Sequence, residues 1–174
     1  TESSKYKFPD VSSGNVLMNW SIPSDSVVIT PTGENKKFTM YNNSVDLSGK
    51  MILQKDKLKG VGTLEWTRTK LKSDKIDFSN RSFDVKNGQL RIAADDGSAL
   101  IKSEDVDADF NLDTKIANIT LNQNDTLPLT TFKYTTNPKY LIFDFDKNTV
   151  QLKSYSPSST FFLESTQLTK EYLR

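Results

Sequence analysis

The chain contains no cysteine and no histidine among its 174 residues. Without cysteine it forms no disulfide, no thiolate nucleophile and no cysteine-ligated zinc site. Without histidine it lacks the Ser-His-Asp and Cys-His catalytic arrangements and all imidazole metal ligands. Paired carboxylates could still act as acid and base, but no spacing among the 22 acidic residues marks two that face each other. We therefore expect no enzymatic activity and no cofactor.

Net charge and long apolar runs are also missing. The 23 basic and 22 acidic residues leave a formal charge of +1, so no overall field attracts nucleic acid. No apolar stretch approaches the roughly 18 residues that a membrane-spanning helix needs, and no signal-peptide pattern opens the sequence. These absences predict a soluble segment without a membrane span, from which any export signal has been removed.

Strand and turn signals dominate what is present. Apolar residues at every second position from Val16 to Ile22 predict a strand with one buried face. Asn87-Gly88 is a favoured hairpin dipeptide because both residues accept positive φ, and Asp96-Gly97 is similar. Gly60 and Gly62 inside a strand pattern indicate a bulge or the close approach of another backbone. Turn signals recur at roughly 7–13 residues, close to the spacing of about 8–12 residues in regular all-β folds.

A short pattern repeats within residues 71–152. Residues 71–77 (LKSDKID) are echoed thirty residues later by residues 101–107 (IKSEDVD). Each copy precedes a pattern of two short apolar segments around a polar turn, and a related pattern follows at residues 143–152. We interpret these patterns as hairpins and the repeated Lys-Ser pair as part of a solvated strand face. A period of this length is typical of stacked repeat units, so Phe83, Phe110 and Phe143 are expected to be buried.

The sequence predicts an all-β, mostly antiparallel module: a β-solenoid or jelly-roll-like stack of strands with an irregular sheet region at its N-terminal side. We divide it into a polar lead-in (residues 1–14), an N-terminal β region (15–60), a repetitive β module (61–164) and a C-terminal segment (165–174). Residues 165–173 are the best candidate for a short helix, and a strand is the alternative. The whole is expected to form one structural unit of a larger protein.

Three alternating aspartates, Asp105, Asp107 and Asp109, are the candidate metal ligands. On a strand their carboxylates project from one face, and calcium prefers several oxygen ligands. The sequence lacks the glycine and the terminal glutamate of an EF-hand loop, so a solvated strand face with Val106 and Ala108 turned inward remains the alternative.

Aromatic residues offer a second candidate site. Trp20, Trp66 and Tyr140, with Tyr134 and Tyr155, could form a flat platform on which a sugar stacks. Aromatic side chains are more often core residues or cross-strand partners, each burying roughly 150–250 Å². The sequence alone does not decide between a sugar-binding platform and aromatic residues of the core.

Two family resemblances follow from these patterns. The order Phe-x-Tyr-x-Thr from Phe132, then residues 143–146 (FDFD) and 150–154 (VQLKS), resembles a segment of large Bacteroidetes cell-envelope proteins of unknown function. The strand and turn unit at residues 71–121 looks like the repeats of periplasmic lipopolysaccharide-transport proteins of the LptA/OstA type. The second resemblance implies an exported protein, an open β-jelly roll with an apolar interior, and a lipid-bridging role. The irregular first seventy residues and the charged Asp107 and Asp109 beside the supposed interior depart from that pattern.

The most favoured function is that of a non-catalytic structural or binding module in an exported bacterial cell-envelope protein, in the periplasm or at the cell surface. Its expected partners are neighbouring β modules of the same larger chain. Two alternatives remain: binding or transport of a lipid or lipopolysaccharide in an apolar groove, and glycan binding or adhesion. An open apolar groove would favour lipid, and exposed coplanar aromatic rings would favour sugar.

Overall fold

The computed structural model describes residues 8–93, 99–122, 127–129, 134–136, 138–144, 146–147, 149–154 and 160–164. All regular structure in these residues is β-strand, which confirms the all-β prediction. The strands are β1 (Val11–Ser12), β2 (Asn15–Ser21), β3 (Ser26–Thr32), β4 (Phe38–Met40), β5 (Val45–Gln54), β6 (Lys57–Trp66), β7 (Thr69–Phe78), β8 (Ser82–Ala93), β9 (Ala99–Asn111), β10 (Ile116–Leu121), β11 (Leu127–Leu129), β12 (Tyr134–Thr136), β13 (Pro138–Asp144), β14 (Thr149–Ser154) and β15 (Thr160–Glu164).

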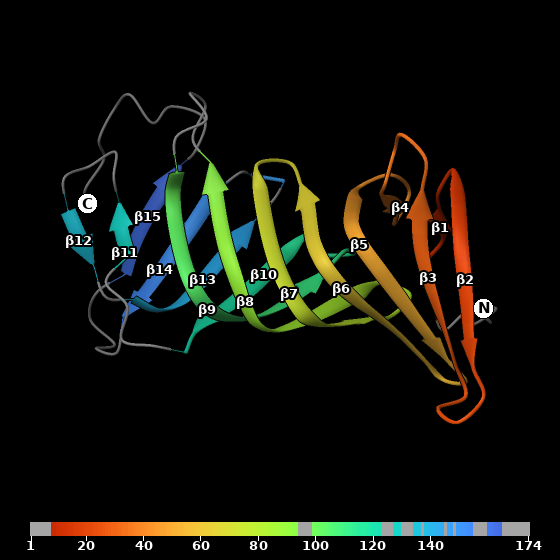
Figure 1. Cartoon of the computed structure of the whole chain (residues 1–174). Helices are drawn as coiled ribbons and strands as arrows, with labels where there is room; N and C mark the ends of the chain where they lie inside the picture. Colours follow the sequence, from red (N-terminus) through yellow and green to blue (C-terminus); the bar gives the residue numbers. More distant parts are fainter. Residues whose placement is uncertain are drawn as a thin grey trace, which may run out of the picture.

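Thirteen of these strands form one antiparallel sheet, and β11 and β12 form a second, two-stranded one. The large sheet runs from β1 and β4 through β5, β6, β7, β8, β9, β10, β13 and β14 to β15, and the β2–β3 hairpin joins it at β5 (Figure 1). The sequence predicted a boundary at residue 60 between the N-terminal β region and the repetitive module. In the structure β5 pairs with β6 on both sides of this residue, so the sheet is continuous there. The described residues include no helix long and apolar enough to cross a membrane.

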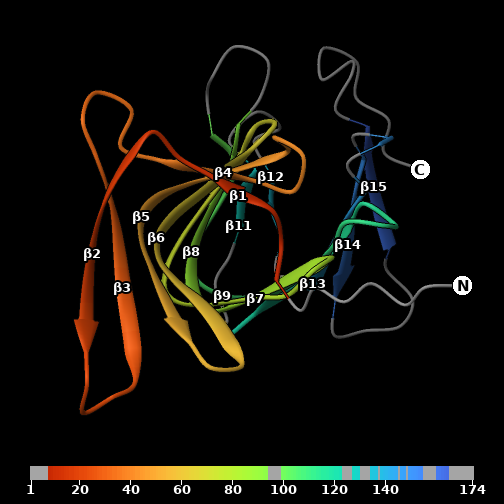
Figure 2. The ribbon, with the colours of Figure 1, turned by 90° about the vertical axis from the view of Figure 1, so that its right-hand side faces the viewer.

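The long central strands fold back on themselves (Figure 2). Trp66 pairs with Thr69 at the start of β7, and Phe83 pairs with Phe78 at its end. If β7 were straight, its two ends, and therefore Trp66 and Phe83 beside them, would lie about 30 Å apart, at roughly 3.3 Å per residue. The Trp66 and Phe83 rings are instead 5.5 Å apart, so the two halves of the strands face each other as two arms.

Glycines make the bend in the first two long strands. Gly49 of β5 pairs directly with Gly62 of β6. A Cβ on Gly62 would collide with the backbone oxygen of Ser48 and lie 2.8 Å from the Gly49 Cα. The pairing of β6 with β7 also shifts register between Gly60 and Gly62. Both structures expected from the glycine pair, a bulge and a close backbone approach, are therefore present.

The next three strands bend through an extra residue. In β8 the buried side chains change phase between Val85 and Gly88, and the register with β9 shifts at the same place. Asn87 there has a φ of +49°, the left-handed conformation. The hairpin predicted at Asn87-Gly88 is therefore wrong: residues 82–93 form one strand, and the dipeptide that accepts positive φ makes a bulge inside it.

The thirty-residue repeat marks two strands that run in the same direction. Residues 71–77 lie in β7 and residues 101–107 in β9, with the antiparallel β8 between them. In both, the serine is buried, Ser73 at 8% and Ser103 at 3% exposure, with buried apolar residues two positions before and three positions after. The interpretation of the Lys-Ser pair as a solvated face is wrong for the serines, because small side chains fill the crowded inner side of the bend.

The two other hairpins of the repeated region are confirmed. β9 and β10 are joined by a turn at residues 112–115, and β13 pairs with β14. Phe83, Phe110 and Phe143 are all buried, as expected. The Asp96-Gly97 turn and the helix candidate at residues 165–173 lie outside the described residues.

The arms close on each other at their free ends. The Phe83 ring stacks on Phe110 at 4.8 Å, and the Trp66 ring packs against both of them. The Tyr41 hydroxyl donates to the backbone oxygens of Ser79 and Ser82 at 3.0 and 2.8 Å, so it ties the turn after β4 to the turn between β7 and β8. Burial raises the Tyr41 pKa, and the nearby charges of Asp10 and Asp84 raise it further, so the hydroxyl keeps its proton.

The first predicted strand exists, but its apolar face is not buried. Val16, Met18 and Trp20 lie on β2, which is exposed along its length except at Ser21. Trp20 is 69% exposed and Ile22, just after the strand, is 77% exposed. Alternation identified a strand, yet the core beneath the sheet ends before it reaches this hairpin.

Candidate functional site

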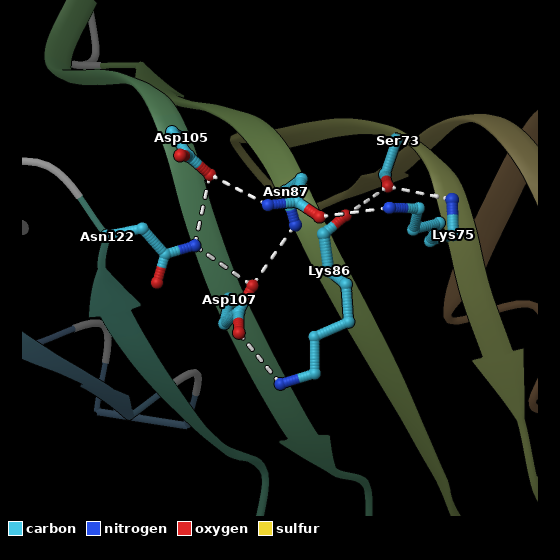
Figure 3. A network of polar contacts seen from close by, with 7 residues as sticks. All are labelled: Ser73, Lys75, Lys86, Asn87, Asp105, Asp107 and Asn122. Atoms are coloured by element: carbon cyan, nitrogen blue, oxygen red, sulfur yellow. Dashed lines mark hydrogen bonds and ion pairs between the residues drawn. The ribbon is translucent and has the colours of Figure 1, made fainter.

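A network of polar side chains covers the outer side of the bend in β7, β8 and β9 (Figure 3). Its centre is Asp107, whose Oδ1 accepts from the Asn87 backbone N–H at 3.1 Å and from Asn122 Nδ2 at 3.0 Å. Asp107 Oδ2 pairs with Lys86 Nζ at 2.8 Å. The members are Ser73, Lys75, Lys86, Asn87, Asp105, Asp107 and Asn122.

The network reaches through the bend to the buried serine of β7. Ser73 Oγ donates to the Lys86 backbone oxygen at 2.6 Å and accepts from the Lys75 N–H at 2.9 Å. It thereby satisfies backbone groups that the bulge removes from the regular ladder of hydrogen bonds. In β9 the equivalent Ser103 Oγ is buried with no hydrogen-bond partner among the described residues.

Charge pairing holds Asp107 ionised. Partial burial acts to raise its pKa, but hydrogen bonds from Lys86, Asn122 and the Asn87 backbone, together with the charge of Lys86, lower the pKa overall. The hydrogen bond to Asp107 in turn raises the Lys86 pKa. A permanently charged pair of this kind can fix the bulge, whereas proton transfer near neutral pH needs a group whose pKa lies close to it.

The three candidate calcium ligands divide between two environments. Asp105 and Asp107 point outward, with Val106 and Ala108 buried between and beside them, as the sequence predicts. Asp105 Oδ1 accepts from Asn122 at 3.0 Å, so both carboxylates already have protein donors. Within the described ranges no three acidic side chains are grouped so that they could hold a metal ion. Calcium binding stays a prediction, and it would require displacing these donors.

Asp109 belongs instead to a row of aspartates that crosses three strands. Asp77 of β7 pairs with Asp84 of β8, which pairs with Asp109 of β9. The Asp84 pKa is raised, first by partial burial and then by the charges of Asp109 and Asp77. Sequence reasoning missed this row because only the cross-strand register brings the three residues together.

The candidate sugar platform does not assemble. Trp66 is only 6% exposed and packs against Phe83 and Phe110 in the core. Trp20 is exposed on β2 and Tyr140 on β13, on strands that lie toward opposite ends of the sheet. Tyr134 lies in the separate two-stranded sheet, and Tyr155 lies outside the described residues.

The site residue that the sequence conceals is Tyr41. It follows β4 in a polar turn, has a φ of +55°, and gives no periodic signal. Its partners are backbone oxygens 38 and 41 residues further along the chain. Only the closing of the arms reveals its role.

No protein-family model, curated protein or solved structure matches this chain.

Proposed function

We propose that this chain is a non-catalytic structural module of an exported bacterial cell-envelope protein, in which it packs beside other β modules of the same larger chain. The observation that carries the proposal is the filled space between the two arms. From β4 to β10, side chains of both arms occupy this space and bury one another.

A lipid-carrying groove needs apolar surface that an acyl chain can occupy. Here that surface is occupied by the chain's own side chains: Leu71, Leu90 and Ile101 from one arm are fully buried, as are Ile76 and Val85 from the other. The contacts of the Trp66 ring with Phe83 and Phe110 of the other arm, and the Tyr41 hydrogen bonds, close the space further. This packing supports a structural role over lipid transport.

The outer face supports the same proposal. The polar network ties its carboxylates to lysine and asparagine donors, and these contacts hold the bulges in place. The exposed aromatic residues Trp20 and Tyr140 lie on separate strands, so they give no shared surface for stacking a sugar. The proposed location in the cell envelope rests on the sequence resemblances described above.

A fluorescent fatty-acid titration tests the structural role. We expect no saturable, stoichiometric binding, and no increase in melting temperature when lipopolysaccharide or phospholipid is added. The matched control is the double variant Met18→Ser with Trp20→Ser, which removes the exposed apolar side chains of β2 and reports any nonspecific adsorption there. Saturable binding that survives in this variant, and that lipopolysaccharide displaces, would overturn the proposal in favour of lipid transport.

A further inference from the structure

The strand β2 carries four of the seven large apolar side chains that are exposed among the described residues. Trp20, Met18 and Leu17 are 69%, 61% and 54% exposed, and Val16 is 38% exposed. Burial of such side chains is the main favourable contribution to association, and contiguous exposed apolar patches mark interaction sites.

β2 is also an edge strand. Among the described residues it pairs with β3 alone, so one side of its backbone has N–H and C=O groups free for another strand. Proteins usually protect such edges with lysine, proline, bulges or a short strand. β2 has seven residues, none of them charged or proline, and its pairing with β3 is regular throughout. The edge therefore offers a template for strand addition.

Met18 is the central residue of the seven in β2. Val16 and Trp20 stand two positions to either side of it, Leu17 and Asn19 one position, and the ends are Asn15 and Ser21. In an antiparallel pair of identical strands centred on Met18, each residue faces the one at the mirrored position. We propose that two copies of this chain associate through β2, antiparallel and two-fold symmetric, with Met18 facing Met18.

On the face of β2 that carries Met18, this register brings apolar side chains opposite each other, whereas on the other face Leu17 lies opposite Asn19. Trp20 of each copy faces Val16 of the other, an aromatic and β-branched cross-strand pair of the kind that stabilises sheets. Met18 already continues a row of apolar residues across the sheet through Ile29 of β3 to the buried Met51 of β5. The second copy extends this row, so the sheet passes from one molecule to the other.

Charge does not oppose the association. Neither β2 nor β3 contains a charged residue, although 26% of the chain is charged, and the net charge of each copy is +1. With roughly 150–250 Å² on an exposed tryptophan, the apolar side chains of one strand offer on the order of 400–500 Å² per copy. That is less than the roughly 800 Å² per partner of a standard interface, so the dimer should be concentration-dependent.

Cysteine cross-linking tests the pairing, because the natural chain has no cysteine. Residues directly opposite in an antiparallel pair have Cα atoms about 4.5–5.5 Å apart, within the range that a disulfide spans. Met18→Cys should therefore form a disulfide-linked dimer under mild oxidation. Ile22→Cys is the matched control: Ile22 is more exposed than Met18, but the two copies would lie on the order of 25 Å apart. Random collision would cross-link Ile22→Cys at least as fast, and that result would overturn the proposal.

A charge-exchange experiment adds a readout without covalent chemistry. Met18→Lys and Met18→Glu should each be monomeric in sedimentation velocity, because each would place like charges opposite each other. Mixing the two should restore a dimer, since residue 18 faces itself only in the proposed register. Circular dichroism checks that both variants are folded, as expected for an exposed position. A wild-type chain that stays monomeric at all concentrations, including one whose β2 surface binds vesicles or another protein instead, would contradict the proposal.

Discussion

Ser73 and Ser103 occupy equivalent positions in the repeat, two residues after the buried Leu71 and Ile101, but their hydroxyl groups differ. Ser73 Oγ makes two hydrogen bonds to backbone groups, and Ser103 Oγ makes none with the described residues. A buried hydrogen bond contributes roughly 0.5–1.5 kcal/mol, whereas a buried hydroxyl without a partner is unfavourable.

Alanine substitutions should therefore separate the two serines. We expect Ser73→Ala to lower the free energy of unfolding by about 1–2 kcal/mol, because it leaves the Lys86 carbonyl and the Lys75 N–H without this partner. Ser103→Ala should be neutral or stabilising. Urea unfolding of both variants measures the difference, and equal losses at the two sites would contradict this assignment.

The row of aspartates across the three strands gives a second prediction about individual residues. Like charges directly opposite on neighbouring strands are destabilising. Asp84→Asn should therefore raise the free energy of unfolding at neutral pH. Because the folded-state pKa of Asp84 is raised, its charge costs stability above that pKa, and the cost disappears as pH falls through it.

The gain from Asp84→Asn should accordingly shrink in acid, when Asp84 of the natural chain becomes protonated. Urea unfolding at neutral and acidic pH measures this, with Asp25→Asn in the β2–β3 turn as a control away from the row. A gain that is independent of pH, or larger in acid, would show that the row is not its cause.

For individual residues, the sequence predicts burial and side-chain direction where these depend only on the spacing of nearby residues. Burial of Phe83, Phe110 and Phe143, and the outward direction of Asp105 and Asp107, follow from apolar residues at alternate positions. The aspartate row and the Tyr41 contacts depend on which strands lie side by side. No short segment of the sequence determines the register between strands or the contact between the two arms. These features could therefore not be predicted from the sequence.

Among the strands, β8 contains a residue whose preferred backbone conformation is compatible with two different structures. Asn87 adopts positive φ, which a hairpin turn and a bulge both require. The choice is made by pairing: β7 and β9 flank β8 along nearly its whole length, and a turn at Asn87 would break both ladders. A reading of the dipeptide alone could not decide between them.

Substitutions at Asn87 test the bulge. A left-handed conformation costs most residues roughly 1–2 kcal/mol, and β-branched side chains more. Asn87→Val should therefore lower the free energy of unfolding by at least that amount, while Asn87→Gly should cost less because glycine accepts positive φ. Thermal unfolding compares the two variants, and a valine variant as stable as the glycine variant would be inconsistent with the bulge.

β2 shows the complementary case. Its alternating apolar residues identify the strand correctly but assign its apolar face to the core. The packed arms bury the same face of the sheet further along, at Met51 and Leu58, and β2 lies beyond them. Periodicity therefore distinguishes the two faces of a strand, but not whether anything covers the apolar one.

At the scale of the whole molecule, the thirty-residue repeat and the bend have one cause. One antiparallel strand, β8, lies between the two copies, and each copy has a small buried residue, Ser73 or Ser103, at the bend. Stacking these bent strands builds two arms whose apolar faces cover each other. The sequence predicted stacked strands with buried apolar residues; that the interior is filled by its own side chains depends on three-dimensional packing.

The two tryptophans allow this closed interior to be measured directly. Trp66 lies between the arms beside Phe83, whereas Trp20 is exposed on β2. In a Trp20→Phe variant, we expect blue-shifted Trp66 emission that acrylamide and iodide scarcely quench until the protein unfolds. The reciprocal Trp66→Phe variant should show red-shifted, readily quenched emission from Trp20. Red-shifted and strongly quenched Trp66 emission from the folded protein would mean that the space between the arms is open to solvent and is not filled by the chain's own side chains.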